Sequence, residues 1–205
     1  QYIRWLGLGV GALFLLVASG ANLGRNSAET VASLVLVVAG LMLTASAQNL
    51  VLLFAALELI SIPTYVLLML GQRDPMSQEA ATKYFLLSVL SSAVLLYGFS
   101  FLYGLGGSMQ LGAIAEQLAS PEAAHQRPLA VVALVLIFAG LAFRLGAVPF
   151  HFYAPDVYQG TTQLNAGLLS VIPKLAALVG LTVVLIVKPH GERCVITLYF
   201  GDKLM

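Results

Sequence analysis

The sequence predicts an all-α fold, a polytopic transmembrane helix bundle, from its composition and from the spacing of its apolar stretches. Of the 205 residues, 60% are hydrophobic and 9% are charged, whereas soluble domains have about 25% charged residues. The mean hydropathy is +0.94. The apolar residues form separate stretches, each close to the ~20 residues that a helix needs to cross a bilayer. We therefore expect an integral membrane protein.

Six apolar stretches are expected to span the membrane as helices. In chain order they are Trp5–Leu23, Thr30–Ala47, Val51–Leu70, Ala80–Tyr103, Leu129–Val148 and Leu164–Val187. The first stretch, preceded by Arg4, also has features of a cleaved signal peptide. Its apolar run is longer than the typical 7–15 residues and five more spans follow, which favours a transmembrane helix.

The longest connection, residues 104–128, is expected to contain a short helix at the membrane interface. Its apolar residues recur at helical spacing within a polar stretch, at Leu111, Ile114, Ala115 and Leu118. The Lys/Arg balance of the connections is nearly even, so the positive-inside rule does not fix the orientation.

Charge and cysteine content argue against several functional classes. A net charge of +1 without a basic stripe argues against nucleic-acid binding. The single Cys194 excludes an internal disulfide, and His125, His151 and His190 are scattered, without the spacing of a zinc, haem or iron–sulfur site. We expect no cofactor or metal in this chain.

Four charged residues, Glu58, Lys83, Arg144 and Lys174, fall in four different apolar stretches. A charge at the centre of a membrane helix costs roughly 2.5–3.5 kcal/mol on an insertion scale, so we expect these residues to face one another inside the protein. Buried ionisable residues in membrane spans commonly belong to ion or proton paths. This pattern predicts a function in ion or proton movement.

The surroundings of Glu58 and Lys174 favour proton transfer over a structural role. Each lies close to a proline, Pro63 or Pro173, which removes one helical hydrogen bond and leaves polar backbone nearby. Lys174 is at the centre of its span and cannot reach the headgroups. The alternatives are a purely structural Lys174 and a Glu58 hydrogen-bonded to a neighbour such as Ser61 or Tyr65.

Lys83 is less clear because it lies near the start of its span. A polar stripe of Tyr84, Ser88, Ser91 and Ser92 follows it, and small residues allow another helix to bring a carboxylate close. Alternatively, Lys83 extends to the headgroup region.

The fifth stretch predicts a broken helix. Gly146, Pro149, Pro155 and Gly160 interrupt it, and unwound backbone at membrane depth is tolerated where it lines protein or a cavity, as in transporters. Arg144 lies at this break. His151 is interpreted as a hydrogen-bonded structural residue or a site residue, and Asp156 as a cap or loop anchor.

Four segments resemble subunit N of proton-pumping NADH:quinone oxidoreductase (complex I). They are LELISIPTYVLL, SQEAATKYFLLSVLSSAVLLYG, GLAFRLGAVPFHFYAPDVYQGT and LLSVIPKLAAL. The resemblance runs from about Thr30 to Val187, and VPFHFYAPDVYQG favours subunit N over the related subunits L and M and over cation/proton antiporter subunits. All of these share the antiporter-like fold.

The resemblance implies that residues 30–187 form one five-helix antiporter-like unit with a discontinuous helix. Residues 1–29 are then a leading transmembrane helix and loop, and the second unit of the family is missing. Residues 188–205 do not resemble the family's next helix. They suggest a truncated or shifted reading frame, and we assign them no function.

The resemblance also implies roles for the buried charges. Glu58, Lys83 and Lys174 match family positions of a proton relay. Arg144 departs from the family, which typically has lysine paired with the glutamate there. Because a guanidinium does not lose its proton in a protein, Arg144 is expected to act as an electrostatic modulator.

The function expected from the resemblance is that of a membrane subunit of NADH:quinone oxidoreductase carrying part of a proton path. NADH, FMN, iron–sulfur clusters and quinone would bind partner subunits, and the partners would be other membrane subunits of complex I and lipid in a bacterial plasma membrane. The alternatives are a cation/proton antiporter subunit and a structural membrane scaffold.

Overall fold

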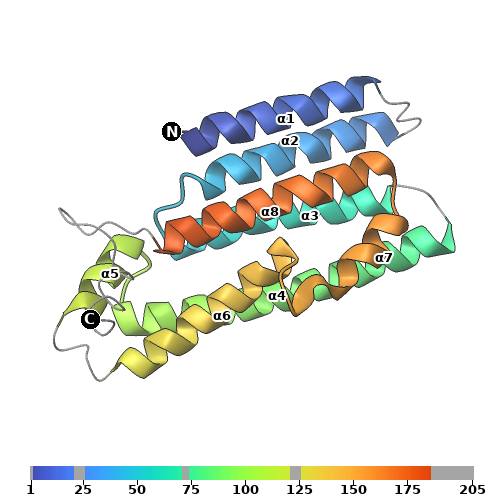
Figure 1. Cartoon of the computed structure of the whole chain (residues 1–205). Helices are drawn as coiled ribbons and strands as arrows, with labels where there is room; N and C mark the ends of the chain where they lie inside the picture. Colours follow the sequence, from blue (N-terminus) through green and yellow to red (C-terminus); the bar gives the residue numbers. More distant parts are fainter. Residues whose placement is uncertain (1, 21–25, 71–73, 121–125, 186–205) are drawn as a thin grey trace.

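The computed structural model describes residues 2–20, 26–70, 74–120 and 126–185, and these are almost entirely helical (Figure 1). The elements are α1 (Tyr2–Gly20), α2 (Ser27–Thr44), α3 (Leu50–Met69), α4 (Pro75–Gly106), α5 (Leu111–Ala119), α6 (Arg127–Leu145), η3 (Phe150–Tyr153), α7 (Ala154–Gln159) and α8 (Gln163–Leu185). The all-α prediction is confirmed.

Five segments within the described residues are long and apolar enough to cross a membrane. They are Ser27–Thr44, Leu50–Met69, Pro75–Gly106, Pro128–Gln159 and Gln163–Leu185. The first expected span also forms a helix, but its apolar part, Trp5–Gly20, is shorter than these. The expected span ends at Leu23 and Val187, and the tail 188–205, lie outside the described residues.

Helices α3 and α8 form the middle of the bundle, with α1 and α2 on one side and α4 and α6 on the other (Figure 1). Their facing residues are fully buried, among them Leu53, Leu57 and Leu168. Large apolar side chains such as Ile62 and Val135 are exposed on the outer faces. An apolar outer face suits a chain surrounded by lipid, which solvates Leu and Val as well as a protein interior does.

Glycines let α4 and α6 approach until their backbones touch. A Cβ atom on Gly98 would lie 2.9 Å from the backbone nitrogen of Ile137 and 3.0 Å from the carbonyl oxygen of Ala133. A Cβ atom on Gly140 would lie 3.0 Å from the carbonyl oxygen of Ser91. Small residues at a membrane helix crossing allow this approach, and it places the end of α6 against α4.

The short helix expected in the longest connection is α5, and it packs on α4 through the apolar residues that predicted it. Leu111, Ile114 and Ala115 are buried. The start of α5 is also tied to the start of α3, since the N–H of Leu50 donates to the carbonyl of Met109 at 3.0 Å and that of Leu111 to Gln48 at 3.1 Å.

The predicted break follows α6 and is built on a glycine. Gly146 has φ +67°, a left-handed conformation that ends a helix and favours glycine. The chain continues as η3 and α7 before turning into α8. Two contacts hold this segment: the Tyr153 hydroxyl donates to the carbonyl of Phe143 at 3.0 Å, and Gly160 packs closely on the backbone of Met76 in α4. Helices α3 and α8 continue through Pro63 and Pro173.

We predict that Gly98→Ala destabilises the protein by about 1–3 kcal/mol, because the added methyl group meets the backbone of α6 and forces the two helices apart. Gly104→Ala is the matched control in α4, since nothing lies within 4 Å of its Cβ position. The control should be neutral or slightly stabilising. Unfolding of the purified protein in detergent, followed by circular dichroism, measures both, and equal effects would contradict the close packing.

Candidate functional site

Arg144 and Glu58 form an ion pair in the interior of the bundle. Arg144 lies in the last turn of α6, and its side chain is 5% exposed. Its Nη2 atom is 2.6 Å from Oε1 of Glu58 on α3, whose side chain is 23% exposed. The expectation that charges in the apolar stretches face one another is thus met by Glu58 and Arg144. Pairing reduces the cost of removing both charges from water.

Two serine hydroxyls complete the contacts of the guanidinium group. Nη2 of Arg144 also donates to Oγ of Ser92 on α4 at 2.9 Å, and Ser92 in turn donates to Oε1 of Glu58 at 2.6 Å. Nη1 of Arg144 donates to Oγ of Ser61 and, at 3.3 Å, to the carbonyl of Leu57. Three helices therefore meet at one group, which we call the Arg144 cluster: Leu57, Glu58, Ser61, Ser92 and Arg144.

The cluster follows from helical spacing. Glu58 and Ser61 are three residues apart on α3 and so share one face of that helix. Ser92 reaches them from α4, one residue after Ser91, whose hydroxyl donates to the carbonyl of Gly140 at 2.7 Å. Among the described residues, the Nε atom of Arg144 has no hydrogen-bond partner. The guanidinium is thus held at its two terminal nitrogens.

Aromatic side chains pack beside the cluster and connect it to the helix break. Phe143 and Tyr153 stack with ring centres 4.6 Å apart, and Tyr84 lies 5.9 Å from Tyr153. Tyr65 lies 5.8 Å from Tyr84, and its hydroxyl donates to Ser88 at 2.7 Å. The sequence had suggested Ser61 or Tyr65 as partners of Glu58. In the structure, Ser61 contacts Arg144 and Tyr65 contacts Ser88 instead.

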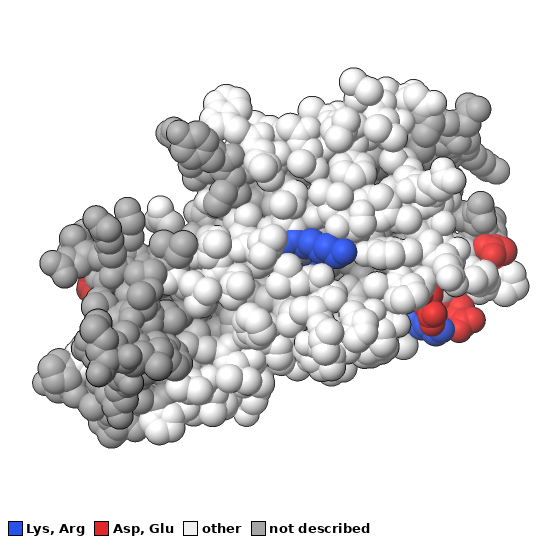
Figure 2. All heavy atoms as spheres, in the orientation of Figure 1, with Lys and Arg blue, Asp and Glu red and all other residues white. Residues whose placement is uncertain are grey.

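Lys83 does not join this cluster, which corrects the expectation that the four membrane charges face one another. Its side chain is 43% exposed, and Nζ lies 2.8 Å from Oε1 of Glu79 and 2.8 Å from Oδ2 of Asp156. Lys83 precedes Ser92 by nine residues, about 13 Å along a helix, and is therefore too far from Glu58. Figure 2 shows acidic and basic side chains gathered at one edge of the molecule.

The Lys83 contacts confirm that a carboxylate from another helix comes within reach. Asp156, interpreted from sequence as a cap or loop anchor, lies on α7, so this ion pair fastens the segment after the break to α4. The pair is exposed in the described chain, and ion pairs in water contribute little to stability.

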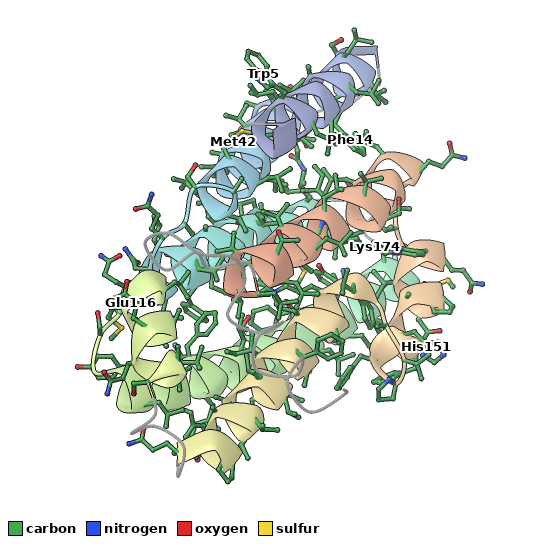
Figure 3. All side chains as sticks on the ribbon, turned by 60° about the vertical axis from the view of Figure 1, so that its left-hand side comes forward. Trp5, Phe14, Met42, Glu116, His151 and Lys174 are labelled. Carbon is green, nitrogen blue, oxygen red and sulfur yellow. The ribbon has the colours of Figure 1, made fainter. Side chains whose placement is uncertain are left out.

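Lys174 also lies apart from the Arg144 cluster. It is on α8, half-buried, on the side toward α7 (Figure 3), and its Nζ atom is 6.0 Å from the ring centre of Tyr158. This is the outer limit of a cation–π contact. No salt bridge to Lys174 is found within the described ranges. The expectation that Lys174 faces the other membrane charges therefore gains no support from an ion pair in this part of the chain.

His151 is exposed on η3, pointing away from the bundle (Figure 3). No hydrogen bond of its ring is found in the described part of the chain, so the structural interpretation of this residue gains no support. Those same residues contain no group of three or more His, Cys, Asp or Glu side chains that could hold a metal ion.

The sequence indicated the serines but not their partners. Ser92 belonged to a polar stripe on its helix, and Ser61 lies one turn after Glu58, which was the available signal. The donor that both serines meet is Arg144, and its position depends on where α6 ends. The hydrogen bond from the Asn165 side chain to the carbonyl of Leu67, at 2.8 Å, was not expected. It joins the start of α8 to the end of α3.

Residues 47–200 match the protein family described as NADH:quinone oxidoreductase/Mrp antiporter, TM. The chain is 44% identical over 154 residues to NAD(P)H-quinone oxidoreductase subunit 2 of Synechocystis sp., a match that covers 75% of this chain and 30% of the relative. It is also 44% identical over 164 residues to NADH-quinone oxidoreductase subunit N of Cutibacterium acnes, covering 80% of this chain and 30% of the relative.

Solved structures give the same result. A chain of respiratory complex I from Thermus thermophilus with bound aureothin superposes with a TM-score of 0.72 at 35% identity. The match covers 88% of this chain and 38% of that chain. This sequence thus spans about 30% of the length of the two curated relatives.

We predict that Glu58→Ala destabilises the protein more than Arg144→Ala. Without Glu58, the buried guanidinium keeps its charge because it cannot lose its proton, and breaking a buried pair in this way costs about 3–5 kcal/mol. Without Arg144, the group left unpaired is the Glu58 side chain, which is more exposed, at 23% against 5%. Unfolding in detergent measures both variants. A larger loss of stability for Arg144→Ala than for Glu58→Ala would show that the unpaired guanidinium does not determine which variant is less stable.

Proposed function

Because the chain belongs to the family of NADH:quinone oxidoreductase and Mrp antiporter transmembrane proteins, we propose that it carries part of a proton-translocation path in the membrane part of an NADH:quinone oxidoreductase. The observation that carries the proposal is the Arg144–Glu58 pair, a buried ionic site at a helix break. The 44% identity to relatives named as subunits of this oxidoreductase supports it.

In the proposed mechanism, Arg144 is a fixed positive charge. Its guanidinium keeps its charge and holds the side chain of Glu58 in the ion pair. Lys174 is the cation that takes and gives a proton, because an ammonium in an apolar span can become neutral. A proton that reaches or leaves Lys174 then changes the field at Glu58, and this coupling links the two groups across the bundle.

Lys83 takes a different part in this proposal. Its ion pair with Asp156 joins α4 to α7 at the exposed edge of the molecule. In the proton relay, Lys83 would serve protons that arrive from the edge of the molecule, where its side chain is half-exposed.

The rest of the proposed assembly lies in other chains. NADH, FMN, iron–sulfur clusters and quinone would bind partner subunits, and this chain would contact other membrane subunits and lipid in a bacterial plasma membrane. Redox chemistry in those partners would drive proton movement here.

A cation/proton antiporter subunit is the second candidate, because the family description includes Mrp antiporters. NADH-dependent proton transport by a quinone-reducing complex separates the two functions. In a structural scaffold, removal of the charges would leave transport unchanged in an assembled complex.

We predict that Lys174→Ala lowers proton transport without loss of assembly, because it removes a titrating group from a half-buried position. Proton uptake by proteoliposomes supplied with NADH and quinone measures the rate. Ser170→Ala is the matched control on α8, since this half-buried hydroxyl donates to the carbonyl of Gly167 on the same helix. Transport at the wild-type rate in the assembled Lys174 variant would show that Lys174 is structural.

Arg144→Lys should retain proton transport and Arg144→Ala should impair it, because the proposal requires a positive charge beside Glu58. The same proteoliposome assay applies, with the amount of assembled complex measured on native gels. If the Ala variant transports protons at the wild-type rate in an intact complex, no charge is required at this position.

A further inference from the structure

We infer that Ser61 and Ser92 are positioning residues that adapt this site to arginine: they hold the two terminal nitrogens of Arg144 on either side of its contact with Glu58. The inference rests on the proposed function and concerns how the fixed charge is kept in place.

The first argument is the direction of the hydrogen bonds. Arg144 donates through Nη1 to Ser61 on α3 and through Nη2 to Ser92 on α4. Ser92 accepts from Arg144 and donates to Glu58, so it connects the two charged groups by a second route. A guanidinium presents its donors in a rigid plane. Contacts at both ends therefore fix its orientation.

The second argument is burial. Ser61 and Ser92 are 2% and 7% exposed, and a buried hydroxyl needs a partner to offset its desolvation. Ser61 also donates to the carbonyl of Leu57 at 3.0 Å, which leaves its oxygen free to accept from Arg144. Each of the two hydroxyl groups therefore donates one hydrogen bond and accepts one from Arg144 within the cluster.

The third argument is the difference between arginine and lysine. A lysine side chain ends one bond earlier and carries a single nitrogen, so its ammonium cannot occupy both the Nη1 and the Nη2 positions. Attraction to Glu58 would hold it at the Nη2 side, beside Ser92. Ser61 would then lose its charged partner. The two serines should therefore respond differently to Arg144→Lys.

A pair of double-mutant cycles tests this asymmetry. Ser61→Ala and Ser92→Ala are each combined with Arg144 and with Arg144→Lys in the assembled complex, purified through a tag on this chain. The readout is the number of protons transported per NADH oxidised in proteoliposomes. A loss of packing or assembly lowers both quantities together, whereas a displaced charge lowers their ratio.

In the Arg144 background, each serine variant should lower this ratio, because each removes one of the hydrogen bonds that orient the guanidinium. In the Arg144→Lys background, Ser92→Ala should retain that effect, and Ser61→Ala should change the ratio less than about twofold. Ser91→Ala is the matched control. It removes a buried hydroxyl from the same turn of α4, but that hydroxyl contacts the carbonyl of Gly140 and neither charged group.

A second measurement keeps the inference separate from the proposed function. The temperature at which half of this chain is lost from the complex, read on native gels, should show the same asymmetry between Ser61 and Ser92 even if the complex moves no protons. Absence of transport in the wild-type complex would overturn the proposed function only. Equal effects of both serines in both backgrounds, in transport and in thermal loss, would overturn the positioning role.

Discussion

The membrane interior imposes one constraint on this protein, namely that the Arg144 guanidinium must keep its charge in the absence of bulk water. It cannot become neutral, so the surrounding helices have to supply a counterion and acceptors. Glu58, Ser61 and the Leu57 carbonyl come from α3, and Ser92 comes from α4. The relative positions of three helices are thereby coupled to a single side chain.

The helix break determines how Arg144 can meet that requirement. Because α6 ends at Leu145 and the chain turns at Gly146, the arginine sits where a helix terminus carries partial negative charge, which favours a cation. The close contact between Gly140 of α6 and the backbone of Ser91 brings this end against α4. The turn at Gly146 and the glycine contact between α4 and α6 therefore place the charged group.

The sequence predicted the helices and a meeting of membrane charges inside the bundle, because both follow from the cost of polar groups in lipid. It placed the fourth span at Ala80–Tyr103, whereas α4 runs from Pro75 to Gly106. Composition marks the apolar part of a helix, but its ends depend on local caps such as the proline in the first turn of α4. The expectation that Lys83 faces the other charges failed for a different reason. The spacing of apolar residues does not determine how far a residue near a helix end lies from a partner on another helix.

The length of α4 has a consequence for how the protein sits in a bilayer. Its 32 residues rise about 48 Å, whereas the hydrocarbon core is about 30 Å thick. Tilts of membrane helices up to about 40° do not absorb this difference. At least one end of α4 must then emerge among the headgroups. The end that carries Glu79 and Lys83, already engaged with Asp156, is suited to that depth, and it would mark the boundary between hydrocarbon and water on this side of the protein.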